Sequence, residues 1–175
     1  MDWTKLIFDL IDLRSFSNLW YWIALAVTWS TASHWVLGIP YDMVIRARRK
    51  GGQAEEDLAD LTRVNTGRIL YIADEAGLIL IALGALVLTM LALLGFYYRV
   101  EFCQAVFLIL APMMGVALLS VATARKIRDN GDAGEALRRR LTVHRVTVQV
   151  IGMVSIFVTA FWGMLMNFNL SIIPL

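Results

Sequence analysis

The feature that most constrains this chain is a set of four apolar runs, each long enough to cross a lipid bilayer. The runs cover about residues 19–39, 69–95, 102–124 and 146–168. A transmembrane helix needs about 20 apolar residues, because it rises about 1.5 Å per residue through a hydrocarbon core about 30 Å thick. The runs are continuously apolar, whereas the strands of a membrane barrel alternate apolar and polar residues. The sequence therefore predicts an all-α membrane protein with four transmembrane helices in two hairpins.

Composition favours a single membrane domain over residues 1–175. Hydrophobic residues make up 59% of the chain and charged residues 17%, whereas a soluble domain has about half and about a quarter. The formal net charge of +2 is too small to indicate nucleic-acid binding. The single cysteine, Cys103, excludes an intrachain disulfide and a cysteine-ligated cluster or zinc site.

The first 15 residues have the pattern of a short amphipathic helix. Their apolar side chains recur with helical spacing, and their charged side chains share the opposite face. The apolar positions are Trp3, Leu6, Ile7, Leu10 and Leu13, and the charged positions are Asp2, Lys5, Asp9 and Asp12. This pattern predicts a helix over residues 1–15 that lies in the membrane surface.

The distribution of basic residues predicts the orientation of the chain. Thirteen of its 16 lysines and arginines fall in the two loops expected at residues 41–68 and 125–145. Short basic loops stay on the cytoplasmic side of a membrane. Both termini are therefore expected on the opposite side.

Two basic clusters in these loops are candidates for contact with anionic lipid headgroups or an acidic partner surface. The first cluster consists of Arg46, Arg48, Arg49 and Lys50, and the second of Arg138, Arg139 and Arg140. We expect membrane lipid to bind at these clusters.

Ionisable residues inside membrane helices are often functional, which draws attention to two places. His34 and His144 lie in or beside the first and fourth runs, and they would have to face each other at one depth to ligate a b-type haem. The alternative is that a histidine here forms a hydrogen bond within the packed bundle. Asp74 and Glu75 stand in the second run, where they mark an ion route or pair with Arg68 or Arg145.

Small residues recur at helical spacing in the second and third runs. They are Ala73, Gly77 and Gly84, followed by Ala111 and Gly115. Such positions allow helix backbones to approach closely, which predicts that they pack the bundle or receive an external partner helix.

Three stretches resemble a known family. They are RSFSNLWYWIALA at residues 14–26, STASHWVLG at 30–38 and IGMVSIFVTA at 151–160. Over essentially its whole length the chain resembles a small alphaproteobacterial inner-membrane family whose members are often named "component of SufBCD complex". The resemblance implies a location in the bacterial inner membrane, and it implies no particular activity. In that membrane, the distribution of basic residues predicts that both termini lie in the periplasm.

The sequence contains no catalytic constellation and no predicted metal site, and it calls for no cofactor beyond bound lipid. We therefore expect a non-enzymatic accessory, assembly or stabilising subunit of a larger membrane complex, such as a respiratory or photosynthetic one. Its partners would be other integral membrane subunits. Two alternatives remain: a small transporter or channel that uses the polar residues around His34, and a b-type haem protein that uses His34 and His144.

Overall fold

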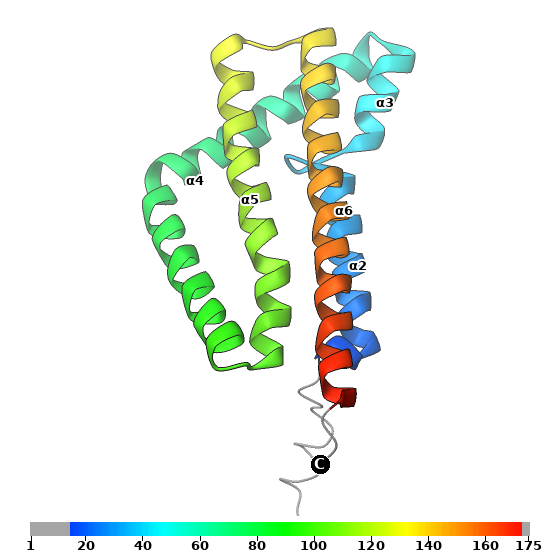
Figure 1. The fold of residues 1–175 in the computed structure, drawn as a ribbon. Coiled ribbons are helices and arrows are strands. Elements are labelled where there is room, and N and C mark those ends of the chain that lie inside the picture. The colour runs from blue at the N-terminus through cyan, green and yellow to red at the C-terminus, as the bar shows by residue number, and fades with distance from the viewer. Residues whose placement is uncertain (1–14, 173–175) are drawn as a thin grey trace, which may run out of the picture.

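The computed structural model describes residues 15–172 (Figure 1). The surface helix predicted for residues 1–15 lies outside this part of the chain, apart from its last residue. Within the described residues the chain forms five α-helices, which confirms the prediction of an all-α class. They are α2 (Leu19–His34), α3 (Tyr41–Lys50), α4 (Gln53–Ala92), α5 (Glu101–Asn130) and α6 (Gly134–Ile172).

Short elements link these helices. A 3-10 turn, η1 (Ser15–Ser17), precedes α2, and a single π-helical turn, η2 (Leu93–Tyr97), follows α4. Two strands of two residues each, β1 (Trp35–Val36) and β2 (Ile39–Pro40), form an antiparallel hairpin between α2 and α3.

Three helices are long and apolar enough to cross a membrane. They are α4 with η2, α5, and α6 through Phe168. In contrast, α2 has 16 residues and is about 24 Å long, which is shorter than a hydrocarbon core about 30 Å thick. The prediction of a continuous helix over residues 19–39 is wrong at its end, because the chain leaves the helix after His34 and enters the hairpin.

The two predicted loops are largely helical. Residues 41–68 form α3 and the first part of α4, and residues 125–145 form the end of α5 and the start of α6. The breaks between these helices are short and fall at glycines with positive φ, at Gly51 and Gly52 and again at Gly131 and Gly134. Glycine adopts this conformation without steric cost, whereas the charged residues on either side are compatible with a helix.

Figure 1 shows α2, α5 and α6 running lengthwise, while α4 bends midway along its length. The first part of α4 lies across the end of the bundle that holds α3 and the α5–α6 connection. Its second part runs down beside α5. Two buried threonines before the bend, Thr62 and Thr66, donate hydrogen bonds of 2.7 Å to the carbonyls four residues earlier, an arrangement that often bends helices.

The main hydrophobic cluster lies at the end of the bundle with the predicted basic loops. It unites the hairpin with α3, α4, α5 and α6 through Val36, Leu37, Ile39, Val44, Ala47, Leu58, Ile127, Leu137 and Leu141. Side chains of α4 and α6 bond to the backbone in and beside the hairpin: Asn65 Nδ2 donates to the Gly38 carbonyl at 3.1 Å, and Arg145 Nε donates to the carbonyl of Ser33 in the last turn of α2 at 3.2 Å. The hairpin is therefore a packed and hydrogen-bonded part of the fold.

The opposite end is held by a glutamine shared among three elements. Gln104 of α5 is buried and donates from Nε2 to the Gly95 carbonyl of η2 at 2.8 Å. Trp162 Nε1 of α6 donates to Gln104 Oε1 at 2.9 Å. A Cβ at Gly95 would lie 2.9 Å from the Gln104 backbone nitrogen, so a larger residue could not adopt this position unless the backbone moved.

Pro112 creates a specific requirement inside α5. Proline has no N–H, so the carbonyl of Leu108, four residues earlier, loses its usual helical donor. The Ser155 hydroxyl of α6 lies 3.4 Å from this carbonyl and donates to it. An interhelical hydrogen bond thus replaces the missing intrahelical one, which matters in a region where water is scarce.

Ser155→Ala should therefore lower the stability of the bundle by about 0.5–1.5 kcal/mol. The measurement is reversible unfolding in mixed detergent micelles with increasing sodium dodecyl sulfate. In a Pro112→Ala background the restored N–H satisfies Leu108, so the same serine substitution should cost clearly less. Equal costs in the two backgrounds would contradict this account.

Candidate functional site

An apolar groove lies between α4 and α5 at the level of the long apolar helices. Its volume is about 640 Å³, and its walls come from residues 69–81 of α4 and 114–125 of α5. Ala73 and Gly77 form part of the α4 wall, and a Cβ added at Gly77 would meet no atom within 4 Å. The absence of larger side chains at these positions leaves the groove open.

Charged residues close the end of this groove nearest the bend of α4. An Arg125 amino group lies 3.4 Å from Asp74 Oδ1, and an Arg128 amino group lies 3.9 Å from Asp74 Oδ2. Asp129 also contacts Arg128, at 3.4 Å. Arg125 lines the groove, so the site is apolar along its length and cationic at one end.

The structure corrects the predicted partners of Asp74. The expected partners were Arg68 or Arg145, but the observed ones are the two arginines of α5. Arg145 instead lies over the Tyr41 ring, with 3.9 Å between its guanidinium carbon and the ring centroid. Glu75 is exposed, and no ion pair involves it within the described residues.

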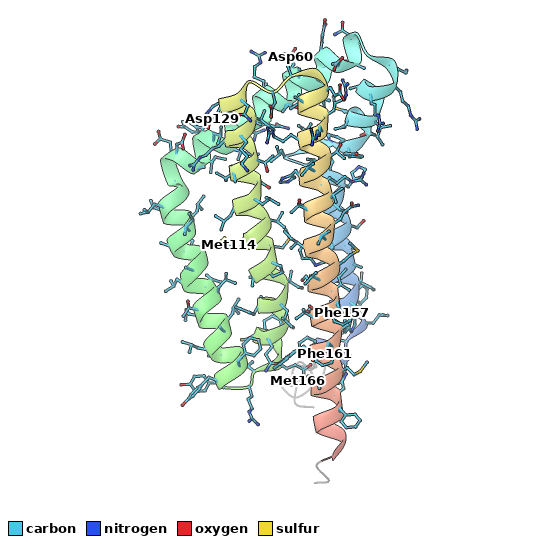
Figure 2. All side chains as sticks on the ribbon, turned by 45° about the horizontal axis from the view of Figure 1, so that its top comes forward. Asp60, Met114, Asp129, Phe157, Phe161 and Met166 are labelled. Atoms are coloured by element: carbon cyan, nitrogen blue, oxygen red, sulfur yellow. The ribbon has the colours of Figure 1, made fainter. Side chains whose placement is uncertain are left out.

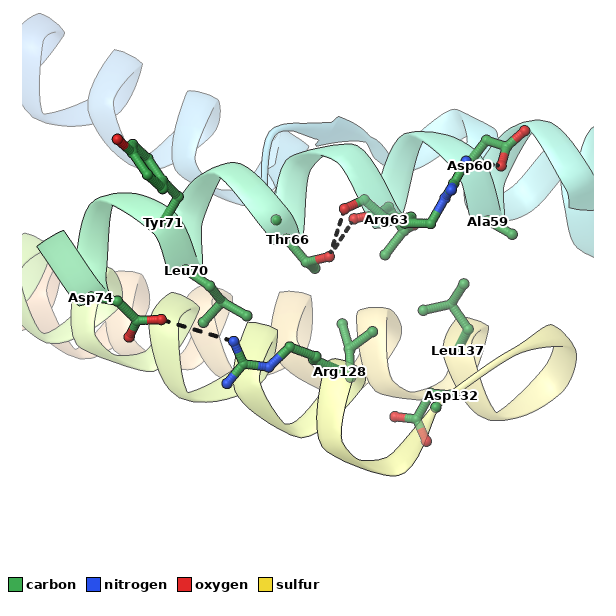
Figure 3. Close-up of a pocket in the computed structure, with 14 residues that line it drawn as sticks. Ala59, Asp60, Arg63, Thr66, Leu70, Tyr71, Asp74, Arg128, Asp132 and Leu137 are labelled. Atoms are coloured by element: carbon green, nitrogen blue, oxygen red, sulfur yellow. Dashed lines mark hydrogen bonds and ion pairs between the residues drawn. The ribbon is translucent and has the colours of Figure 1, made fainter.

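A second hollow, of about 770 Å³, lies on the other side of the same ion pair (Figure 3). The first part of α4 forms one wall of it, and the ends of α5 and α6 form the other. Asp74 and Arg128 lie at one end of this hollow, and Asp132 and Leu137 lie at the other. Its charges are mixed: Arg63 and Arg128 alternate with Asp60, Asp74 and Asp132.

The two histidines occupy different environments. His144 is buried in α6, with Nδ1 3.0 Å from the Thr123 hydroxyl of α5 and hydrogen-bonded to it. His34 is exposed at the last residue of α2, where its ring meets the Trp35 ring edge-on. His144 therefore has the role of a packing histidine, and the geometry gives no support to a haem held by this pair.

The predicted basic clusters differ in what they contact. Arg138 pairs with Glu55 and ties α6 to α4, and Arg140 pairs with Asp132 and ties α6 to the connection that follows α5. Arg46 pairs with Asp42 on the surface of α3. The remaining members are exposed and have no acidic partner among the described residues; they are Arg48, Arg49, Lys50 and Arg139.

The predicted packing residues also separate into two kinds. A Cβ at Gly84 would overlap the terminal methyl group of Met114, so this glycine contacts α5 through the end of a flexible side chain. At Gly77 and Gly115 a Cβ would meet nothing within 4 Å, so these two glycines make no close contact inside the described chain. Ala73 lines the α4–α5 groove, and Ala111 lines a smaller one between α5 and α6.

Besides the contact at Gly95, sequence reasoning missed two tight glycine contacts on α6. A Cβ at Gly152 would lie 2.8 Å from a ring carbon of Trp29, and one at Gly163 would lie 3.3 Å from the Phe16 ring. Neither glycine has a glycine or alanine four residues away. The signal that could have found them is pairing of a glycine with a large aromatic on another helix, and the sequence alone does not reveal that pairing.

Among the described residues, no group of three or more His, Cys, Asp or Glu side chains is placed to hold a metal ion. Comparisons of the chain with protein-family models, curated proteins and solved structures each give no match. The resemblance to the inner-membrane family therefore stays an expectation from the sequence.

Substitution of these glycines by alanine should separate the two kinds of position. Gly152→Ala should destabilise the bundle by about 1–3 kcal/mol, because the new methyl group overlaps Trp29. Gly115→Ala should leave stability unchanged or raise it by up to about 1 kcal/mol, because alanine favours a helix and the space is open. Detergent unfolding midpoints measure both. A loss at Gly115 as large as that at Gly152 would show that the helices meet there.

Proposed function

We propose that this chain is a non-enzymatic integral membrane subunit that binds and stabilises a larger membrane complex, such as a respiratory or photosynthetic one. In this proposal it resides in the bacterial inner membrane with its basic end in the cytoplasm and both termini in the periplasm. The helix α2, together with the β-hairpin, would form a fourth membrane crossing. The four crossings would then make two helical hairpins.

The observation that carries the proposal is an open apolar face on α5 and α6. A groove of about 360 Å³ between these helices is lined by Ala111 on α5 and by Val150 and Val154 on α6. Gly115 lies one turn further along α5, where it is exposed and has open space at its Cβ position. Small residues at this spacing allow a third helix to approach closely.

The flanking side chains extend this face. Val150 and Val154 are about half exposed, and Phe157 is 73% exposed further along α6. Figure 2 shows Phe157 and Phe161 on the same half of α6. Lateral contact in a membrane depends on close packing, because lipid tails are as apolar as the helices themselves. On this face the small residues Ala111 and Gly115 lie beside β-branched and aromatic side chains, a combination that is suited to close helix packing.

The test is quantitative mass spectrometry of proteins that co-purify with the tagged full chain from its native membrane in mild detergent. We expect an energy-transducing membrane complex at near-stoichiometric amounts. Gly115→Leu should reduce its recovery by about tenfold or more, because the new side chain fills the face while meeting nothing inside the chain. Gly77→Leu is the matched control, since it also points into open space but in the other groove.

A photoreactive residue at Val154 should cross-link to the partner, while one at Leu78, which borders the α4–α5 groove, should not. Leu78 is 85% exposed, so it tests general exposure. Recovery of the chain alone or only with itself would overturn the proposal. Equal partner loss in the Gly115 and Gly77 variants would show that the α5–α6 face is not the contact.

A further inference from the structure

We propose that the groove between α4 and α5 binds one anionic phospholipid from the leaflet at the basic end of the bundle. An acyl chain lies along the apolar groove, and the lipid phosphate contacts Arg125 with help from Arg128. This site is separate from the α5–α6 face described above, and it does not depend on a protein partner.

The apolar part of the groove has the size and openness that an acyl chain requires. Its volume of about 640 Å³ falls within the range of about 300–1,000 Å³ that is usual for sites of small ligands. None of the most apolar 18 residues of α4 is buried inside the protein, so the α4 wall opens sideways to the bilayer. Gly77 and Ala73 have no large side chain that would fill the groove from the α4 side.

Arg125 stands directly beyond the apolar part of the groove, which is where the phosphate of a lipid with its acyl chain in the groove would lie. Asp74, which contacts Arg125, is three residues before Gly77, a rise of about 4.5 Å along the helix. The Arg125 side chain is half exposed, and its ion pair with Asp74 is long at 3.4 Å. A guanidinium carries five N–H donors, so one loose carboxylate contact leaves several of them available.

Arg128 can add to this binding. It divides its contacts between Asp74 at 3.9 Å and Asp129 at 3.4 Å, and it is about half exposed. Exposed ion pairs of this kind contribute little stability, so a phosphate can join or displace them at small cost. Arginine binds phosphate through paired hydrogen bonds that a lysine cannot reproduce.

The charge pattern favours a lipid over a transmembrane helix in this groove. A partner helix crossing the bilayer would have to continue past Asp74, Arg125 and Arg128, where its apolar surface would meet three charged groups. Near this level α4 bends, and its first part passes across α5 (Figure 1). A phospholipid instead presents its own charge at this depth and its apolar chain below it.

The proposal is tested with the purified full chain by native mass spectrometry, titrating phosphatidylglycerol or phosphatidylcholine into the delipidated protein. The wild-type chain should retain one phosphatidylglycerol in preference to phosphatidylcholine. The double variant R125Q/R128Q should bind phosphatidylglycerol about tenfold or more weakly, because it loses charged hydrogen bonds to the phosphate. Gly77→Leu should reduce binding of the same lipid by filling the groove.

Two matched controls should keep wild-type binding. R99Q removes one exposed charge at the opposite end of the bundle, between η2 and α5, and Gly115→Leu adds the same bulk at another open position. A photoactivatable phosphatidylglycerol applied to the wild-type chain should cross-link within residues 69–81 or 114–125, and this measurement needs no variant. Equal loss in controls and groove variants, no loss in either groove variant, or cross-links confined to α3 would overturn the proposal.

Discussion

The structure depends on one constraint: in a bilayer, every backbone polar group needs a partner within the protein. Long helices satisfy most of them, and side chains from neighbouring elements satisfy two carbonyls that the helices leave open. The carbonyl that Pro112 leaves without a donor receives the Ser155 hydroxyl from the neighbouring helix. The Gly95 carbonyl in the π-helical turn receives the Gln104 amide, whose own oxygen accepts from Trp162. Each repair also joins two helices, so satisfying the backbone contributes to the packing.

The same constraint explains how a β-hairpin can interrupt a mostly helical chain. Its residues lie in the main hydrophobic cluster, and side chains from α4 and α6 bond to the backbone in and beside it. The basic end is therefore a packed part of the fold, in which several arginines link segments of the chain through ion pairs and hydrogen bonds. Arg138 ties α6 to α4 and Arg140 ties α6 to the connection that follows α5, while Arg145 fixes the junction of α2 and α3 through Ser33 and Tyr41.

Hydrophobic runs predicted the all-α class and the three long spanning helices, because run length and continuity are local properties. They overestimated the first span, since a run such as residues 19–39 does not reveal where tertiary packing replaces a helix with a hairpin. The two charged stretches predict loops because polar residues are common in irregular structure. Here the charged residues lie in helices instead, in α3 and at the ends of α4, α5 and α6. Spacing of small residues found Gly84 but not Gly152, whose role depends on Trp29 from another helix.

The functional faces follow from unequal burial of the spanning helices. Within its most apolar 18 residues α6 has 28% buried, α5 has 6% and α4 has none, so the bundle is packed around α6 and loose around α4. Because α4 is little buried beside Arg125, an apolar groove with a charged end remains open. Its apolar length and charged end match the acyl chain and the phosphate of a phospholipid. The face beside Gly115 has small and β-branched residues without charge, which is the chemistry of helix contact. One small bundle thus presents two chemically different surfaces to the membrane, and each selects a different kind of neighbour.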